Sequence, residues 1–79
     1  MSIHVQDYVT KNHDETHHYI IMLIQDMEFE AIFKKDKSTW EWHGDSKNKS
    51  TAEHAKMLNT TEFQLEQLIN ETIGIKETV

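Results

Sequence analysis

Hydrophobic residues of this chain are concentrated in residues 18–42, where they form three runs separated by polar turns. Residues 19–24 are apolar at six consecutive positions, which is typical of a strand that is covered on both faces. In residues 27–33, apolar and acidic side chains alternate, as they do in a strand with one buried face. Trp40 and Trp42 alternate with polar neighbours in the same way. The pattern therefore predicts three antiparallel strands.

The C-terminal part begins with a helix-capping signal. Ser50 and Glu53 fit a capping box, in which the side chain of each residue bonds the backbone amide of the other. The same spacing recurs from Asn59 and indicates a second helix start. These signals predict a short helix over residues 51–58 and a longer one over residues 60–73, with a single helix kinked at Asn59 as the alternative.

The apolar positions of this region fall on one helical stripe, which should pack against the sheet and its aromatic residues. Gly74 fits the left-handed position that follows the last turn of a helix. The stripe consists of Ala55, Leu58, Leu65, Leu68, Ile69 and Ile73.

The N-terminal residues 2–11 fit two patterns. Val5, Tyr8 and Val9 form a short helical stripe, whereas Ile3, Val5 and Val9 alternate as residues of a strand do. We expect a short helix that covers part of the sheet.

Together these elements predict an α+β fold in a single domain spanning residues 1–79. It should contain a small three-stranded antiparallel β-sheet with a short N-terminal element and one or two C-terminal helices packed on one face. Because residues 19–24 are apolar on both faces, the second face must also be covered. The N-terminal element or another copy of the chain would cover it.

We expect a homodimer, since a chain of this size without disulfides often completes its core by association. The strand at residues 19–24 offers two sets of side chains for the contact, and the sequence alone does not fix the register. Its alternative set is Tyr19, Ile21 and Leu23. The candidate dimer surface is Ile20, Met22 and Ile24.

The charge of the chain limits the classes of molecule that it can be expected to bind. The 79 residues include 14 acidic residues, eight lysines and no arginine, for a net charge of −6. Neutralisation of phosphates supplies most of the affinity for nucleic acids, so we expect no direct nucleic-acid partner. An acidic chain is better suited to a protein target with a basic surface, where its field speeds association.

Other classes of protein are disfavoured by what the chain lacks. It contains no cysteine, which excludes disulfides and thiol nucleophiles. No apolar run is long enough to span a bilayer, so we expect no membrane partner and a cytoplasmic location, within a bacterial host cell if the chain is encoded by a phage. No nucleophile is paired with a base at a defined spacing, and a small domain has little room for a closed pocket. We expect neither enzymatic activity nor a cofactor.

His13, His17 and His18 form the densest cluster of potential metal ligands. On a helix, His13 and His17 would share one face, but Asp14 stands where zinc proteases require a glutamate. No third ligand is fixed by the sequence, and structural zinc sites close with four. The sequence therefore predicts a solvated loop and no metal site.

Residues 55–68 resemble a helix-turn-helix motif. A small residue at Ala55 permits close approach of two helices, and Leu58 fits a core position. The reading face would present Glu62 and Glu66 and no basic residue, which is unfavourable beside phosphates.

We therefore expect a small acidic binding protein without catalytic activity. In size and composition, although in no motif, the chain resembles the acidic, cysteine-free proteins with which bacteriophages and mobile elements block a host enzyme or defence system. That likeness implies an inhibitor that presents a DNA-mimicking surface to a nucleic-acid-binding host protein. A helix-turn-helix transcription regulator and a structural dimerisation module are the alternatives. The expected partner-binding surface consists of Glu28, Glu30, Glu41, Glu62, Glu66 and Glu71.

Overall fold

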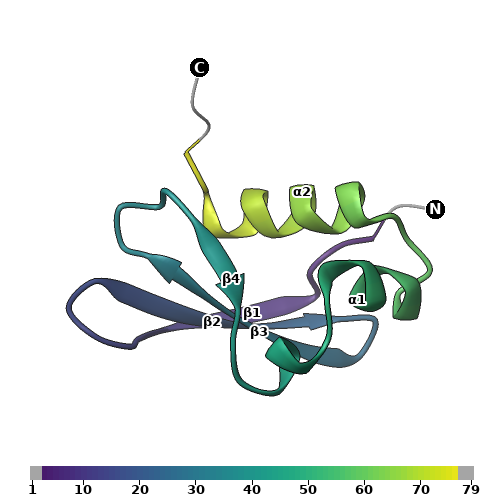
Figure 1. Ribbon diagram of the computed structural model, residues 1–79, viewed down its shortest axis with the longest axis horizontal. Coiled ribbons are helices and arrows are strands. Elements are labelled where there is room, and N and C mark those ends of the chain that lie inside the picture. Colours follow the sequence, from purple (N-terminus) through teal and green to yellow (C-terminus); the bar gives the residue numbers. More distant parts are fainter. Residues whose placement is uncertain (1–2, 77–79) are drawn as a thin grey trace.

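The computed structural model describes residues 3–76, so residues 1–2 and 77–79 of the predicted domain lie outside the described residues. Four antiparallel strands form one sheet in the order β1-β2-β3-β4, and helices follow them in the chain (Figure 1). The predicted α+β fold is confirmed, with four strands rather than three. The elements are β1 (Asp7–Asn12), β2 (His17–Ile24), β3 (Met27–Lys34), β4 (Trp40–Trp42), the 3-10 helix η1 (Gly44–Asn48), α1 (Thr51–Met57) and α2 (Glu62–Ile73).

The additional strand, β1, lies in the segment that the sequence predicted as a short helix, and that prediction is wrong. β1 pairs with β2 along its whole length and brings Val9 opposite Ile21. A helix of so few residues is marginal by itself, whereas strand pairing satisfies one side of the backbone along β1. Ile3 and Val5, which precede β1, pack against the core, and Ile3 lies beside α2. The described N-terminal residues therefore do not cover the second face of β2.

Both helices lie on the same face of the sheet (Figure 1). Because successive side chains of a strand point to opposite faces, the even-numbered residues of β2 and the odd-numbered residues of β3 share this face. The side chains of these strand residues pack against the predicted helical stripe. Within the stripe, Leu68 is only partly buried. The core consists of Ile20, Met22, Ile24, Phe29, Ala31, Phe33, Ala55, Leu58, Leu65, Ile69 and Ile73.

The two tryptophans of β4 lie at the margin of this core and attach the strand to both helices. The indole N–H of Trp40 donates to Oδ1 of Asn70 at 2.6 Å, and that of Trp42 donates to Oγ1 of Thr51 at 2.9 Å. The two rings meet edge to face with centroids 5.1 Å apart. Both side chains are half-buried, so their predicted core role holds for the rings, while the indole nitrogens bind polar partners.

Side-chain caps define where the helices begin. The predicted capping box is confirmed, because the Glu53 N–H donates to Oγ of Ser50 at 3.2 Å and the Ser50 N–H donates to Oε1 of Glu53 at 3.2 Å. The second predicted box is not formed. Asn59 follows α1 in a left-handed conformation (φ 55), and Thr61 caps α2 by accepting the Gln64 N–H.

The end of α2 is fixed to the β3–β4 hairpin. Gly74 adopts the left-handed conformation (φ 82) that the sequence predicted for the residue after the helix. Beyond it, the Lys76 N–H donates to the carbonyl oxygen of Lys37 at 2.9 Å. The hairpin therefore holds the C-terminal end of α2 in place.

Beyond the end of β4, His43 and η1 continue the contacts with β3. The His43 N–H donates to the carbonyl oxygen of Glu30 at 3.0 Å, and the Glu30 N–H donates to Oγ of Ser46 at 2.9 Å. Nε2 of the buried His54 in turn donates to the carbonyl oxygen of Ser46 at 2.7 Å. Polar groups that a short edge strand would leave open are thus bonded within the chain.

The β2–β3 turn is a two-residue hairpin loop with positive φ at both positions, 51° at Gln25 and 63° at Asp26, as in a type I′ turn. Side chains anchor the loop at both positions. Nε2 of Gln25 donates to the carbonyl oxygen of Leu58 at 2.9 Å, and the Asp26 N–H donates to Oε1 of Gln6 at 2.8 Å. These contacts hold Asp26 in a conformation that favours glycine.

We expect Asp26→Gly to raise the free energy of unfolding by about 0.5–1 kcal/mol, because glycine has no Cβ to strain the left-handed position. Asp26→Ala is the matched control and should lower it. Urea denaturation measures both. A stability of Asp26→Gly at or below that of the unsubstituted chain would show that the Asp26 side chain contributes more than its backbone strain costs.

The β1–β2 loop is organised by the carboxylate of Asp14. Its Oδ1 accepts the Thr16 N–H at 2.8 Å, the Thr16 hydroxyl at 3.0 Å and the His17 N–H at 2.8 Å. These hydrogen bonds, the Thr16 N–H first among them, lower the pKa of the Asp14 carboxyl from 3.8 to about 2, with a smaller contribution from the charge of His17. Because the pKa is lower in the folded chain, this contribution to stability is present above pH 3.8 and is lost as the pH falls toward 2.

We therefore expect the stability difference between the unsubstituted chain and Asp14→Asn to shrink as the pH is lowered from 4 to 2. Asparagine accepts the same hydrogen bonds without the charge, so the two chains should converge once Asp14 is protonated. Urea denaturation at several pH values measures the difference. Glu15→Gln removes a neighbouring carboxylate that accepts none of these bonds, and a Glu15→Gln profile like that of Asp14→Asn would contradict the assignment.

Candidate interaction surface

No element among residues 3–76 packs over the sheet face opposite the helices, which we name the open face. It carries the odd-numbered residues of β1 and β2 and the even-numbered residues of β3, because paired residues share a face. The residues of the open face are Asp7, Val9, Lys11, His17, Tyr19, Ile21, Leu23, Glu28, Glu30, Ile32, Lys34 and Glu41.

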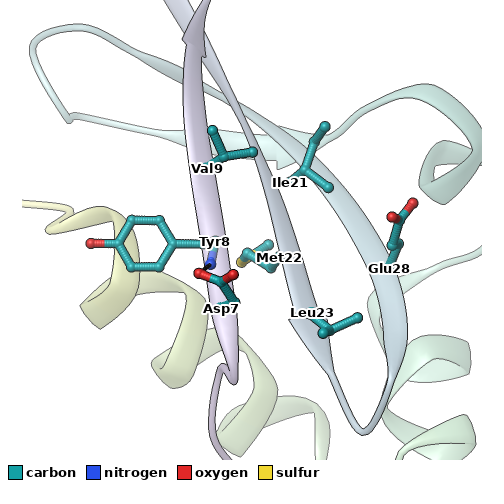
Figure 2. Close-up of a pocket in the computed structure, with 7 residues that line it drawn as sticks. All are labelled: Asp7, Tyr8, Val9, Ile21, Met22, Leu23 and Glu28. Carbon is teal, nitrogen blue, oxygen red and sulfur yellow. Dashed lines mark hydrogen bonds between the residues drawn. The ribbon is translucent and has the colours of Figure 1, made fainter.

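An apolar stripe runs through the open face. The register puts Val9 opposite Ile21 and Tyr19 opposite Ile32, so that these side chains adjoin across three strands. Figure 2 shows Val9, Ile21 and Leu23 beside one another, where they line a shallow hollow. Val9 is 46% exposed and the other four are only partly buried. The apolar stripe consists of Val9, Tyr19, Ile21, Leu23 and Ile32.

Carboxylates border the apolar stripe along β3. Glu28 lies opposite Leu23, and Glu30 lies opposite Ile21. The carboxylate of Glu30 is held against the start of η1, since a Cβ built on Gly44 would lie 2.5 Å from Oε2 of Glu30. The left-handed conformation at this position (φ 59) favours glycine.

The acidic border continues on the outer strands. Asp7 of β1 lies opposite Leu23, and Glu41 of β4 lies opposite Ile32. Lys11 and Lys34 lie toward the other end of the face, next to the β1–β2 loop and the β3–β4 hairpin. The half of the open face around Leu23 is therefore apolar in the middle and acidic at its margin.

At the lysine end, two histidines and a tyrosine form a cluster. The rings of His13 and His43 have centroids 5.2 Å apart, and Tyr19 lies 6.3 Å from His13 and 6.2 Å from His43. His13 also lies 4.0 Å from Oδ2 of Asp14. His43 follows β4 in the chain, so only the folded sheet brings it to His13.

His17 and His18, which are adjacent in the sequence, point to opposite faces of the sheet. His17 points to the open face, where its Nδ1 lies 2.7 Å from the Thr16 hydroxyl, while the adjacent His18 points to the helix face and lies beside Phe33. Consequently the two cannot bind one ion. Within residues 3–76, no three histidine or carboxylate side chains gather as metal ligands.

The six predicted partner-binding glutamates lie in two different layers of the molecule. Three belong to the open face of the sheet, as described above. The other three belong to α2 and are exposed on the side of the helix that does not pack against the sheet. The α2 set consists of Glu62, Glu66 and Glu71, and the sheet set consists of Glu28, Glu30 and Glu41.

The predicted dimer surface on β2 requires a correction. Ile20 is 1% exposed, and Met22 and Ile24 are each 0% exposed, because these side chains form the core beneath the helices. The register instead turns the alternative set to the open face, namely Tyr19, Ile21 and Leu23.

The helices of the resembled helix-turn-helix lie side by side, with Leu65 and Ile69 of α2 buried against the sheet. The exposed side of α2 presents Glu62, Glu66 and a 72% exposed Phe63. α2 contains no lysine or arginine, so this surface has no group to neutralise a phosphate.

Comparison with family models, with curated proteins and with solved structures found no match to this chain. No helix within residues 3–76 has the length and apolar character needed to cross a membrane.

The assignment of the two sheet faces leads to a matched pair of substitutions. We expect Ile20→Ala to lower the free energy of unfolding by about 2–5 kcal/mol, because it leaves a cavity in the core. Ile21→Ala should lower it by less than about 1 kcal/mol, since its side chain is already partly in water. Denaturation of both variants measures the difference. Equal losses would contradict the assignment.

Proposed function

We propose that this chain is a non-catalytic binding protein whose open face covers a basic surface of another protein. The observation that carries the proposal is the combination on that face of an uncovered apolar stripe and an acidic border. Protein interfaces commonly have an apolar centre with a polar rim, and charge at the rim steers association. The partner that fits has apolar residues surrounded by lysine or arginine.

The charge of the whole chain supports the same partner. A net charge of −6 produces a field that attracts basic proteins over distances of about one Debye length, roughly 10 Å at moderate salt. Basic surfaces of this kind commonly bind nucleic acids. The proposal therefore extends to inhibition, in which the chain occupies such a surface and excludes the nucleic acid, as a phage-type inhibitor of a host protein would.

The exposed side of α2 is the second candidate contact. Glu62 and Glu66 are four residues apart and so lie on one side of the helix, next to the exposed Phe63. We favour the open face because it combines its charges with five adjoining apolar side chains, whereas α2 offers one exposed aromatic ring. The helix-turn-helix regulator has less support, since α2 contains no basic residue.

Two double charge reversals distinguish the contacts. Glu28→Lys with Glu41→Lys alters the open face, and Glu62→Lys with Glu66→Lys alters α2. Both change the net charge equally, so any difference between them reports the contact and not the overall field. Glu30 is left unchanged because its carboxylate packs against Gly44.

We expect the tagged chain to retain a basic protein from nuclease-treated bacterial lysate and to release it as the salt concentration rises. With that protein purified, the open-face reversal should slow association about tenfold more than the α2 reversal at low salt. The bound chain should also displace nucleic acid from the partner. A larger effect of the α2 reversal would move the contact to α2, and binding of duplex DNA by the chain itself would favour the regulator.

A further inference from the structure

The two edges of the sheet differ in a way that points to a further interaction surface. The β4 edge is only three residues long, and beyond its end η1 lies beside β3, as described above. β1 is the opposite edge, and all six of its residues are exposed. Two of the most exposed large hydrophobic residues, Tyr8 and Val9, belong to it. An exposed edge of this length is a template for pairing with another strand.

The alternation of hydrogen bonds identifies the backbone groups that β1 presents outward. The His13 N–H donates to the carbonyl oxygen of His17, so odd-numbered residues of β1 direct their backbone groups toward β2. Tyr8, Thr10 and Asn12 therefore direct theirs away from the sheet. The Tyr8 N–H is bonded locally by Oδ1 of Asp7 at 2.8 Å, which is consistent with this direction.

We propose that β1 pairs with β1 of a second copy of this chain, antiparallel and about a two-fold axis at Val9. In this register, Tyr8 of each copy exchanges backbone hydrogen bonds with Thr10 of the other, and the Tyr8 N–H gives up its local bond to Asp7 for one to the Thr10 carbonyl oxygen. Asp7 of each copy lies opposite Lys11 of the other, and the two Val9 side chains lie opposite each other. Both outward backbone groups and side-chain chemistry are thus self-complementary, as an isologous interface requires.

The neighbouring registers that keep the same backbone groups paired lack this complementarity. A shift in one direction puts Lys11 opposite Val9, and a shift in the other puts Asp7 opposite Val9. Each puts a charge opposite an apolar side chain, and neither brings Asp7 opposite Lys11. Charge complementarity therefore selects the register centred on Val9.

This pairing would join the two sheets into one. The axis is perpendicular to the sheet, so the helices of both copies lie on the same side and the two open faces become continuous. The two apolar stripes then meet at Val9. The inference goes beyond the proposed function, because the dimer would form without the partner and would present that partner with two contact surfaces.

Charge exchange tests the register. We expect the unsubstituted chain to be a dimer in sedimentation velocity, and Asp7→Lys or Lys11→Asp alone to weaken it about tenfold, since each replaces attraction by repulsion at both symmetry-related pairs. An equimolar mixture of the two variants should form a heterodimer, and the double variant should dimerise again. A monomeric unsubstituted chain, or single variants that dimerise equally well, would overturn the proposal.

A cysteine probe tests the geometry independently, because the chain has no cysteine of its own. Val9→Cys places two thiols at the axis, where opposed residues have Cα atoms about 4.5 Å apart, within reach of a disulfide. Asn12 is also exposed, but in Asn12→Cys the two thiols would lie about 20 Å apart. Mild oxidation should cross-link Val9→Cys and leave Asn12→Cys monomeric on a denaturing gel. Cross-linking of both, or of Asn12→Cys alone, would contradict the register.

Discussion

The structure depends on the fact that one layer of helices can cover only one face of a sheet. β2 is apolar on both faces, so alternate side chains of the same strand have different environments. Its even-numbered residues form the core with α1 and α2, while Tyr19, Ile21 and Leu23 remain partly exposed. Among residues 3–76, no second layer lies over them. The apolar open face is therefore a direct consequence of how the short chain distributes its hydrophobic residues.

The polar groups at the two sides of the sheet also differ in how they are hydrogen-bonded. Ser46 and His43 bond the backbone of Glu30 beyond the end of β4, and two indole nitrogens attach β4 to the helices. Among the described residues, the outward backbone groups of β1 have one local bond, which the Tyr8 N–H donates to Asp7. The uncovered face and the unpaired edge adjoin at Val9. The exposed apolar side chains and the exposed strand edge therefore lie in one region of the molecule. This is the physical basis for proposing that the chain binds its partners there.

Local signals in the sequence were sufficient for the parts of the fold that depend on neighbouring residues. The alternation around Phe29, the capping box at Ser50 and the glycine after α2 all predicted elements that the structure contains. The second helix begins later than the sequence predicted. Asn59 takes a left-handed conformation, and Thr61, two residues after it, caps α2 instead.

Features that depend on distant residues could not be predicted in this way. Residues of β1 fit a helix or a strand, and only pairing with β2 decides between them. The choice of which β2 side chains face inward depends on the helices, and a shift of one residue would reverse it. The approach of His43 to His13, and the division of the six glutamates between two layers, likewise follow from the folded sheet.

The most direct test of the account is the solvent accessibility of individual methyl groups in the purified chain. A soluble paramagnetic agent broadens NMR signals of methyl groups that it can approach. We expect strong broadening for Ile21, Leu23 and Ile32 of the open face and little for Ile20, Ile24 and Leu65 of the core. Pairing through β1 would leave this contrast unchanged. Equal protection of Ile20 and Ile21 would mean that the open face is covered, and it would contradict the surface on which the proposed function rests.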